Sequence, residues 1–433
     1  MEINHPMKPF HILLCFLLLA VQGVFGQDTL KMMQYNLMYY TTTSGVSDCN
    51  ATTNNISAKD GYIETIFHHV MPDVFCVCEI GSNNSYADRL LNNAINTQGV
   101  DYYRHGPLTN YSGGNIANML FYNSRKLSLY DHYYITTAYR DINGYKMYYN
   151  STGLAQRDTV FITFWIMHLK AGSSQENAAA RHLQTQRLMN KIASMGMPGN
   201  YVVSGDFNVY GSSEDAYQEL VNYSNSLYRF YDPVDRPGNW NNNASFADLH
   251  TQSTHSTNYD NECFSSGGLD DRFDIILVSP YVYYGSDRVR VLPETYHALG
   301  QDGNRFNGTV LQPQNNSVPQ NVAQALFNQS DHLPVITDFL IDAQVGITQY
   351  QRDFLLKVAN PVYDQLTVYM QNETPDQYRF EVFSVDGRRL DVFEEMLDGG
   401  SHTLNHAFSY PKGIYLLKVS NSTGQNQVVK LVR

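Results

Sequence analysis

Polar side chains that can bind a cation or transfer a proton stand beside several apolar runs of this sequence. One run starts at Tyr201 and ends in Gly205-Asp206-Phe207-Asn208. Side chains two residues apart in extended backbone point to one face, so Asp206 and Asn208 should face one cavity while Phe207 faces the core. On its own this pattern is more typical of a turn closed by Asx hydrogen bonds. A catalytic interpretation therefore depends on the other runs.

Similar polar residues recur where other apolar runs start or stop. They are Asn36, Glu79, His168, Asp274, Asp331 and His332. Strand ends in an α/β sandwich gather at one edge of its sheets, which predicts a single site built from these side chains. A glutamate at the end of an apolar run is costly to bury alone, so Glu79 is either a salt-bridged rim residue or a metal ligand.

One histidine and two aspartates are placed to transfer a proton. Asp331 and His332 stand together just before the apolar run that begins at Val335. An acid beside a histidine is common by chance. Here, however, the pair falls at the end of the domain, where Asp274 could orient the imidazole.

The elements that must position these residues alternate between strands and helices. We expect strands over 29–36, 73–79, 118–123, 127–130, 158–168, 201–208 and 274–279, and helices over 58–70 and 181–195. The strands 118–123 and 127–130 are expected to be neighbours. Segment 231–268 is predicted to be a long loop anchored by Trp240 and Phe246, and loops of this length are usually disordered or act as lids.

Composition indicates a large, acidic, globular protein. The chain has 433 residues, 43% of them hydrophobic and 13% aromatic, which is enough for a large core and two domains. Its net charge is −12. A polyanionic substrate must therefore be held by a local basic patch or by a metal ion, and this acidity weighs against nucleic acid without excluding it.

The N-terminus has the pattern of an export signal. Lys8 precedes the apolar run 12–21, and small residues at Gly23 and Gly26 come just before Gln27. This predicts a cleaved signal peptide over residues 1–26. No later segment reaches about eighteen uninterrupted apolar residues, so we expect the mature protein to lie outside the cytoplasm.

Four cysteines remain after the signal peptide: Cys49, Cys76, Cys78 and Cys263. Three pairings are open if all four are oxidised. Cys76 and Cys78 would share one face of a strand, where they lie too close to bridge each other comfortably.

Several of these motifs occur together in an order typical of one superfamily. They are Tyr35-Asn36, Glu79, Met167-His168-Leu169-Lys170, Ser204 to Asn208, Arg272-Phe273-Asp274 and Ser330 to Val335. Over about residues 29 to 341 the chain resembles the endonuclease/exonuclease/phosphatase superfamily, which includes pancreatic-type deoxyribonucleases, sphingomyelinases and inositol-polyphosphate phosphatases. The resemblance implies a four-layered α/β sandwich, and it does not select a substrate.

The resemblance also implies hydrolysis of a phosphoester. Such a reaction needs a cation on the phosphoryl oxygens, a base for water and an acid or cation for the leaving oxygen. Mg²⁺ suits an oxygen-lined site, with Mn²⁺ or Ca²⁺ as alternatives. The implied metal ligands are Glu79, Asn36 and Asp331, and the implied catalytic residues are His168, Asp206, Asn208, Asp274 and His332. Either Asp206 or His332 is the base, a choice that these motifs leave open.

Some positions depart from the superfamily pattern. Cys78 precedes Glu79 and Ile80 follows it, where related nucleases often carry glutamine before the glutamate and arginine soon after. Asn123 stands where they often have arginine. Inositol-polyphosphate phosphatases typically have a cysteine just ahead of the Asp-Arg pair that precedes the Asp274 strand. This cysteine is missing here, which disfavours that branch. Arg181 and Lys170 are candidates for the missing positive charge, although an arginine on a helix more often faces solvent.

Beyond about Ile341 short alternating strands replace the α/β pattern. We expect strands over 354–358, 366–370, 378–384, 413–419 and 428–432, which predict a small all-β, immunoglobulin-like sandwich. Asn360-Pro361, Val385 to Arg389, Lys412 to Lys418 and Lys430 to Arg433 resemble the C-terminal sorting domain of the type IX secretion system. The resemblance implies export across the outer membrane to the medium or the cell surface. A carbohydrate- or protein-binding sandwich is the alternative.

These observations predict a signal peptide (1–26), a phosphoesterase domain (27–342), a linker (343–353) and a sorting domain (354–433). The expected protein is a secreted, monomeric, Mg²⁺-dependent phosphodiesterase, with nucleic acid as its substrate and the secretion machinery as a further partner. The alternatives are a sphingomyelinase-type lipid phosphodiesterase, on which Trp240 would meet a membrane, a small phosphate-ester phosphatase, and a surface-binding protein without activity.

Overall fold

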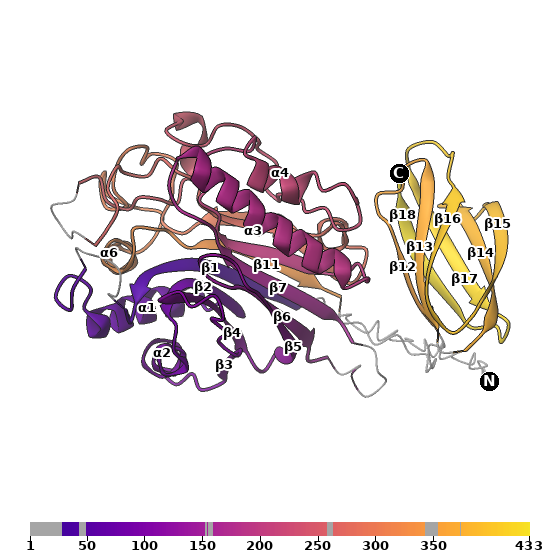
Figure 1. Ribbon diagram of the computed structural model, residues 1–433, viewed down its shortest axis with the longest axis horizontal. Coiled ribbons are helices and arrows are strands. Elements are labelled where there is room, and N and C mark those ends of the chain that lie inside the picture. The colour runs from indigo at the N-terminus through magenta and orange to yellow at the C-terminus, as the bar shows by residue number, and fades with distance from the viewer. Residues whose placement is uncertain are drawn as a thin grey trace, which may run out of the picture.

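The computed structural model describes residues 28–42, 49–151, 154, 159–257, 263–342, 354–372 and 374–433. The predicted signal peptide (1–26) and linker (343–353) lie outside the described residues. The α/β part extends to residue 342, and the all-β part begins at residue 354 (Figure 1). None of the helices in the described ranges is long and apolar enough to cross a membrane.

The first of two packed sheets has the strand order β10-β11-β1-β2-β4-β3. Its strands are β1 (Asp28–Tyr40), β2 (Val74–Gly81), β3 (Tyr103–His105), β4 (Ile116–Asn123), β10 (Val289–Ala298) and β11 (Val335–Ile341). β1 runs parallel to β2 and antiparallel to β11. Strands remote in sequence therefore lie side by side at the centre of this sheet.

The second sheet has the order β5-β6-β7-β8-β9. Its strands are β5 (Leu127–Ile135), β6 (Ile142–Tyr149), β7 (Phe161–His168), β8 (Tyr201–Asp206) and β9 (Asp274–Val278). One apolar cluster joins the two sheets, with Met32 and Cys76 from the first and Phe164 and Val202 from the second. The sheets are therefore stacked face to face.

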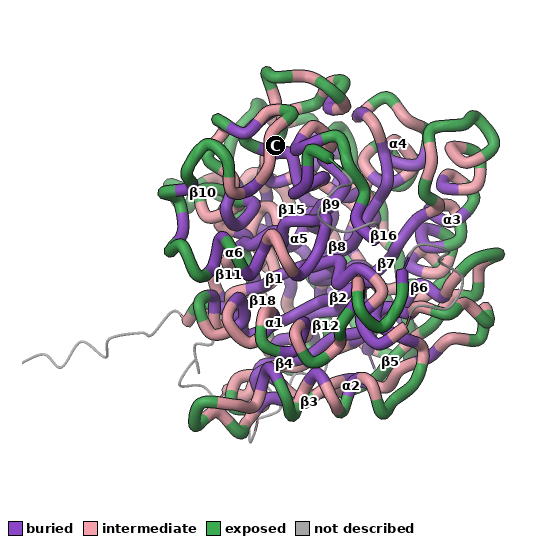
Figure 2. Tube along the Cα trace, turned by 90° about the vertical axis from the view of Figure 1, so that its left-hand side faces the viewer, coloured by how far each residue is buried: buried purple, intermediate pink, exposed green. Residues whose placement is uncertain are grey.

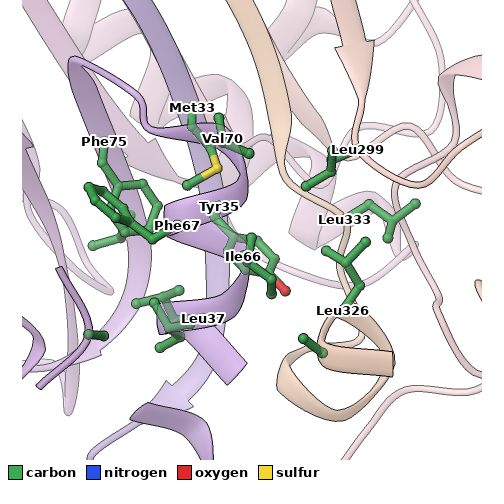
Figure 3. Close-up of a cluster of buried hydrophobic side chains, with 14 of the residues drawn as sticks. Met33, Tyr35, Leu37, Ile66, Phe67, Val70, Phe75, Leu299, Leu326 and Leu333 are labelled. Carbon is green, nitrogen blue, oxygen red and sulfur yellow. The ribbon is translucent and has the colours of Figure 1, made fainter. Parts of the chain in front are cut away.

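Helices cover the outer face of each sheet. The helical elements are α1 (Ile56–Val70), α2 (Asn84–Leu90), η1 (Leu91–Ile95), α3 (Gln175–Ser194), α4 (Asp215–Val221), η3 (Ala244–Leu249), α5 (Pro280–Tyr284) and α6 (Gln320–Gln329). Phe67 of α1 and Leu326 of α6 share a core with Phe75 of the first sheet (Figure 3). Leu188 of α3 packs with Trp165 of the second sheet. The predicted four-layered α/β sandwich is confirmed.

Local capping explains where the predicted helices begin. Asn55 accepts a hydrogen bond from the backbone of Ala58, so α1 starts at Ile56 instead of residue 58. Ser174 likewise caps α3, which starts at Gln175, several residues before the predicted start at 181. The first turn of α3 is polar and carries no apolar periodicity, which is why the pattern missed it.

Two sequence predictions need correction. Segments 118–123 and 127–130 are not neighbouring strands, because β4 belongs to the first sheet and β5 to the second. The chain crosses between the sheets at residues 124–126. The predicted loop 231–268 is interrupted by the short helix η3, whereas Trp240 is fully buried, in agreement with its predicted role as an anchor. Where it is described, this segment is packed against the domain.

The C-terminal part is a sandwich of two antiparallel sheets, as predicted. One has the order β12-β13-β16 and the other β15-β14-β17-β18. The strands are β12 (Phe354–Val358), β13 (Gln365–Asn372), β14 (Asp376–Ser384), β15 (Arg389–Leu397), β16 (Gly400–Ala407), β17 (Ile414–Asn421) and β18 (Asn426–Val432). The sequence did not predict β15 and β16, whose side chains are mostly exposed.

Burial is concentrated in the strands that carry the candidate site. β2, β7 and β8 are buried almost throughout, whereas the loops at the periphery are exposed (Figure 2). Gly205 in β8 permits this packing because its φ is 147° and a Cβ there would lie 1.7 Å from the carbonyl oxygen of Met167. Only glycine fits at position 205, because any other residue type has a Cβ atom that would clash with β7.

We expect Gly205→Ala to destabilise the protein by at least about 2 kcal/mol, because the added methyl group meets backbone atoms and the conformation is unfavourable for alanine. Urea unfolding would measure the change. Gly61→Ala is the control, since a Cβ at this position in α1 meets nothing within 4 Å and should stabilise the helix by about 0.5–1 kcal/mol. Equal stability of Gly205→Ala and the wild type would contradict this account of β8.

Candidate active site

Asn36 and Glu79 lie at irregular points inside β1 and β2. The register of the parallel pairing shifts after Asn36, and Glu79 has a φ of 60°. Met38 and Tyr39 also have positive φ values. Such bulges redirect side chains beside active sites. The prediction that both residues end their strands is therefore wrong, since a bulge in each strand presents the side chain.

One amide group connects the two carboxylates of this site. Nδ2 of Asn36 donates to Oε1 of Glu79 at 3.1 Å and to Oδ2 of Asp206 at 3.0 Å. Oδ1 of Asn36 accepts from the backbone N–H of Met38, and Oε2 of Glu79 accepts from that of Tyr39. The irregular part of β1 after Asn36 thus holds both side chains in place.

The second sheet supplies the facing residues. β7 and β8 are parallel, with His168 opposite Asp206, and β9 pairs with β8 so that Asp274 is also opposite Asp206. Asn208 has a φ of 51° and its N–H donates to Oδ1 of Asp206, an Asx turn. The expectation that Asp206 and Asn208 share a face of extended backbone is therefore wrong. Phe207 is buried, as predicted.

Asp274 holds His332. Nδ1 of the imidazole lies 2.6 Å from Oδ2 of Asp274. Its Nε2 faces the site, 3.7 Å from Oδ2 of Asp206. Burial lowers the pKa of His332, but the carboxylates of Asp274, Asp206 and Asp331 outweigh this effect and hold the pKa well above its usual value. The predicted pairing of an aspartate with this imidazole is present in the structure.

Gln252 is a site residue that the sequence did not reveal. Its Nε2 lies 2.8 Å from Nε2 of His332 and 3.2 Å from Oδ2 of Asp331. The same oxygen of Asp331 accepts from the backbone N–H of Ser265. Gln252 comes from the polar segment 231–268, where no periodic pattern distinguishes one amide from another.

Arg140 is a second residue that the sequence did not reveal. It precedes β6, and its Nη1 lies 2.8 Å from Nδ1 of His168. A guanidinium can only donate, so Nδ1 accepts and Nε2 carries the proton. Burial and Arg140 lower the pKa of His168 well below its usual value. His168 is thus a neutral donor aimed at Asp206 and Glu79, with Nε2 at 3.4 and 3.8 Å from their oxygens.

The two cations proposed from sequence have other contacts. Arg181 is fully buried, not solvated, and its guanidinium contacts both carboxylate oxygens of Glu214. Its Nη1 also donates to the carbonyl oxygens of Lys170 and Gly172. Nζ of Lys170 donates to the carbonyl oxygen of Ala171. Arg140, which contacts His168 directly, is therefore the cation that supplies positive charge to the site, and Arg181 is not.

The donor set of the site fits a divalent cation. Glu79, His168 and Asp206 place one ligand atom each within 4.8 Å of one another. Burial raises the pKa of Glu79, and burial raises that of Asp206 to about 7. The two carboxylates share one amide nitrogen, and the positive charges of His332 and Arg140 only partly offset the effect of burial on the pKa of Glu79. Oxygen donors in this arrangement suit Mg²⁺, Mn²⁺ or Ca²⁺, whereas His168 offers a proton and not a lone pair.

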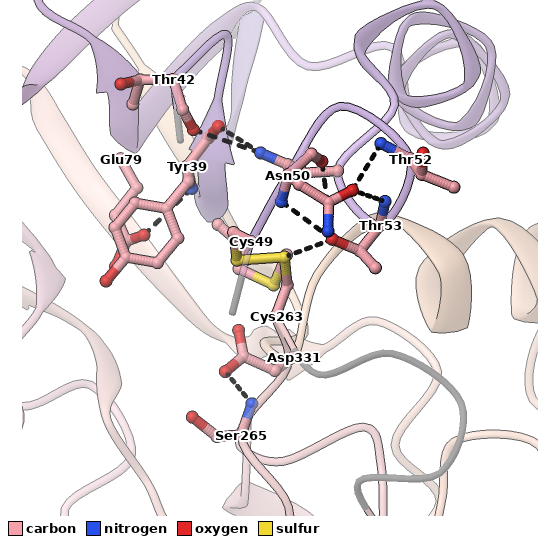
Figure 4. The surroundings of a disulfide bond; sticks show 12 residues. Tyr39, Thr42, Cys49, Asn50, Thr52, Thr53, Glu79, Cys263, Ser265 and Asp331 are labelled. Carbon is pink, nitrogen blue, oxygen red and sulfur yellow. Dashed lines mark hydrogen bonds between the residues drawn. A yellow bond between two sulfur atoms is a disulfide. The ribbon is translucent and has the colours of Figure 1, made fainter. Parts of the chain in front are cut away.

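A disulfide borders the site. Cys49 and Cys263 are bonded, and Cys76 and Cys78 are buried free thiols in β2. Figure 4 shows the disulfide between the Tyr39–Glu79 contact and the Ser265–Asp331 contact. It joins the region between β1 and α1 to the region before β9, which also carries Ser265.

Residues 359–433 match the family model described as "Secretion system C-terminal sorting domain". The predicted sorting domain is confirmed. Such a domain indicates export to the cell surface or beyond and contact with the secretion machinery.

Several solved structures are similar to this chain. The human Nocturnin catalytic domain is 15% identical, covering 72% of this chain and 97% of that one, with a TM-score of 0.43. An endonuclease/exonuclease/phosphatase from Bacteroides vulgatus is 17% identical, covering 72% and 99%, with a TM-score of 0.45. One from Beutenbergia cavernae is 13% identical, covering 93% and 100%, with a TM-score of 0.43. No curated protein matches the chain.

A buried lysine lies behind the site and makes stability depend on pH. Nζ of Lys59 donates to the carbonyl oxygens of Leu37 and Met38. Burial lowers its pKa from 10.5 to about 7. Between these two values the unfolded chain binds more protons than the folded one, so the free energy of unfolding should rise with pH from about 7 to 10.5.

We expect Lys59→Met to remove this rise. The stability of the wild type relative to the variant should increase by about 3 kcal/mol between pH 7 and pH 10. Urea unfolding in chelator at several pH values would measure it, with Lys412→Met, at an exposed position, as the control. A constant difference across this range would show that Lys59 is not held neutral in the fold.

Proposed function

We propose that this protein is a secreted, Mg²⁺-dependent phosphodiesterase that hydrolyses nucleic acid. In this proposal residues 27–342 carry the activity and residues 354–433 direct export. The observation that carries it is the convergence of the buried carboxylates of Glu79 and Asp206 on one amide, between a neutral histidine donor and an Asp–His pair.

Glu79 and Asp206 would hold the cation, together with Asn36 and Asp331. When bound, the ion supplies positive charge to the phosphoryl oxygens and draws a polyanion to an acidic protein. Nδ2 of Asn36 now faces both carboxylates, so a rotation of this amide would offer its oxygen instead. Asp331 has one oxygen engaged by Ser265 and Gln252, which leaves the other for the site.

His332 is the better of the two candidate bases. Asp274 contacts Nδ1 and thereby fixes the tautomer, so Nε2 can take a proton from water once the amide of Gln252, now 2.8 Å from Nε2, moves aside. Asp206, the other candidate, already contacts Asn36 and lies beside His168. Two of the three carboxylates that raise the pKa of His332, those of Asp206 and Asp331, would be neutralised by the ion. The imidazole would then titrate closer to neutral pH, where a general base is effective.

His168, Arg140 and Asn208 would stabilise the phosphoryl group. Nε2–H of His168 points into the site, and Arg140 keeps it in this tautomer. One N–H of the Asn208 amide donates to the carbonyl oxygen of Leu169, which leaves the second N–H free for a phosphoryl oxygen. These donors add no negative charge where charge develops in the transition state.

The structure removes Trp240 as an argument for a sphingomyelinase-type lipid phosphodiesterase. Trp240 is fully buried, its indole N–H donates to the carbonyl oxygen of Arg236, and it cannot meet a membrane. The same burial supports the interpretation of Trp240 as an anchor of its loop.

Metal-dependent cutting of plasmid DNA by the mature protein is the direct test. We expect cleavage with Mg²⁺, none with chelator, and a loss of at least about a hundredfold in Glu79→Gln, because a neutral amide binds the ion weakly. Glu219→Gln on α4 is the matched control. If the folded, Mg²⁺-loaded protein cuts no DNA, the nuclease proposal is wrong, and sphingomyelin and small phosphate esters are the next substrates.

We expect His332→Ala to lower turnover by about two to four orders of magnitude through lost proton transfer. Asp274→Asn should lower it by about ten- to a hundredfold, since it only disturbs the orientation of the imidazole. Steady-state rates on one oligonucleotide would compare the variants, with His297→Ala, a histidine of β10 away from the site, as control. Near-normal turnover of His332→Ala would remove this residue from the mechanism.

A further inference from the structure

Two exposed tyrosines lie on β5 and the loop after it, which carries Arg140, and a third lies on the loop before β4. The side chains of Tyr111, Tyr134 and Tyr139 are exposed by 67%, 46% and 37%. The rings of Tyr111 and Tyr134 are 4.4 Å apart, although one precedes β4 and the other lies in β5. Exposed aromatic side chains that gather in this way are uncommon without a binding role.

Hydrogen bonds connect the segment of Tyr111 to the segment of Arg140. The carboxylate of Asp141 accepts from the backbone N–H groups of Tyr111 and Ser112 and from the hydroxyl of Ser112. Oγ of Ser112 in turn accepts from the N–H of Thr137. Asp141 directly follows Arg140, which contacts His168. The loop of Tyr111 and the loop of Tyr139 are therefore linked to each other, and Arg140 links them to His168.

The strand register places Tyr134 near the end of β7 that carries His168. Tyr134 pairs with Asn143, which pairs with Ile166, two residues before His168. β5, β6 and β7 are successive strands of one sheet (Figure 1). Two strand spacings amount to about 10 Å. This is the length of about three stacked nucleotides.

Three positively charged side chains lie on or beside the loop that carries Tyr139. Nζ of Lys170 lies 5.7 Å from the ring centre of Tyr139. Nη1 of Arg187 on α3 donates to the carbonyl oxygen of Thr136, in the same loop. Arg140 directly follows Tyr139 in the chain. Aromatic rings interleaved with cations are the features that bind bases and phosphates of a single strand.

We propose that Tyr111, Tyr134 and Tyr139 form a stacking platform for the bases of a single-stranded nucleic acid whose scissile phosphate lies at His168. This inference rests on the proposed function and names the substrate class. The rings stack on bases of any sequence, and Lys170 and Arg187 contact flanking phosphates. The platform therefore supports binding of a single strand without sequence preference.

The test compares binding and cleavage in the mature protein. Binding of fluorescein-labelled (dT)12 is measured by anisotropy in chelator, where no cleavage interferes. The double variant Tyr111→Ala/Tyr134→Ala should bind at least about tenfold more weakly, because stacking contributes about 1–3 kcal/mol per base. Tyr130→Ala is the matched control, since this β5 tyrosine is 60% exposed but contacts Phe161, at the opposite end of β7 from His168.

Cleavage with Mg²⁺ separates this inference from the proposed function. The double variant should raise KM for the oligonucleotide and leave the rate on bis(4-nitrophenyl) phosphate unchanged. Equal oligonucleotide binding by double variant and wild type overturns the platform even if both cut DNA. The platform is also overturned if the double variant loses binding to sphingomyelin vesicles but binds the oligonucleotide as the wild type does. The two ideas can also fail separately. If the wild type hydrolyses neither the oligonucleotide nor bis(4-nitrophenyl) phosphate but binds the oligonucleotide more tightly than the double variant does, the platform is supported and the proposed function is wrong.

Discussion

The site depends on holding several carboxylates together inside the protein. Glu79, Asp206, Asp274 and Asp331 are each less than a tenth exposed. Buried charges of one sign repel one another and lose their hydration, so each must have specific partners. Here the partners are the amides of Asn36 and Gln252, the imidazoles, and the backbone N–H groups. An arrangement so unfavourable for stability alone is typical of a site that uses a cation.

Both sheets contribute to this arrangement. Asn36 and Glu79 come from the first sheet, and His168, Asp206 and Asp274 come from the second. Neither set is complete until the apolar faces of the sheets pack against each other. The hydrophobic core between them therefore sets the distances at the site as well as most of the stability. The disulfide adds a covalent link between the flanking regions.

The sequence predicted the residues that stand at strand termini better than those in bulges and loops. Asp206, His168 and Asp274 follow from apolar runs because burial imposes the pattern. The positive φ of Glu79 could not be foreseen, since glutamate rarely adopts it. Arg140 and Gln252 lie outside any periodic run. The Cys49–Cys263 pairing spans 214 residues and follows only from the fold.

Local charge reconciles an acidic protein with a polyanionic substrate. Several buried arginines are neutralised by carboxylates: Arg181 by Glu214, Arg272 by Asp232 and Arg305 by Asp302. Within the described ranges Arg140 has no carboxylate oxygen within 4 Å, and its contact with His168 directs its charge toward the site. Its field also lowers the pKa of Glu79, against the larger effect of burial that raises it. At short range in a poorly hydrated site one such cation outweighs distant surface charges, which salt screens. The net charge of −12 therefore does not decide which substrate can reach the carboxylates.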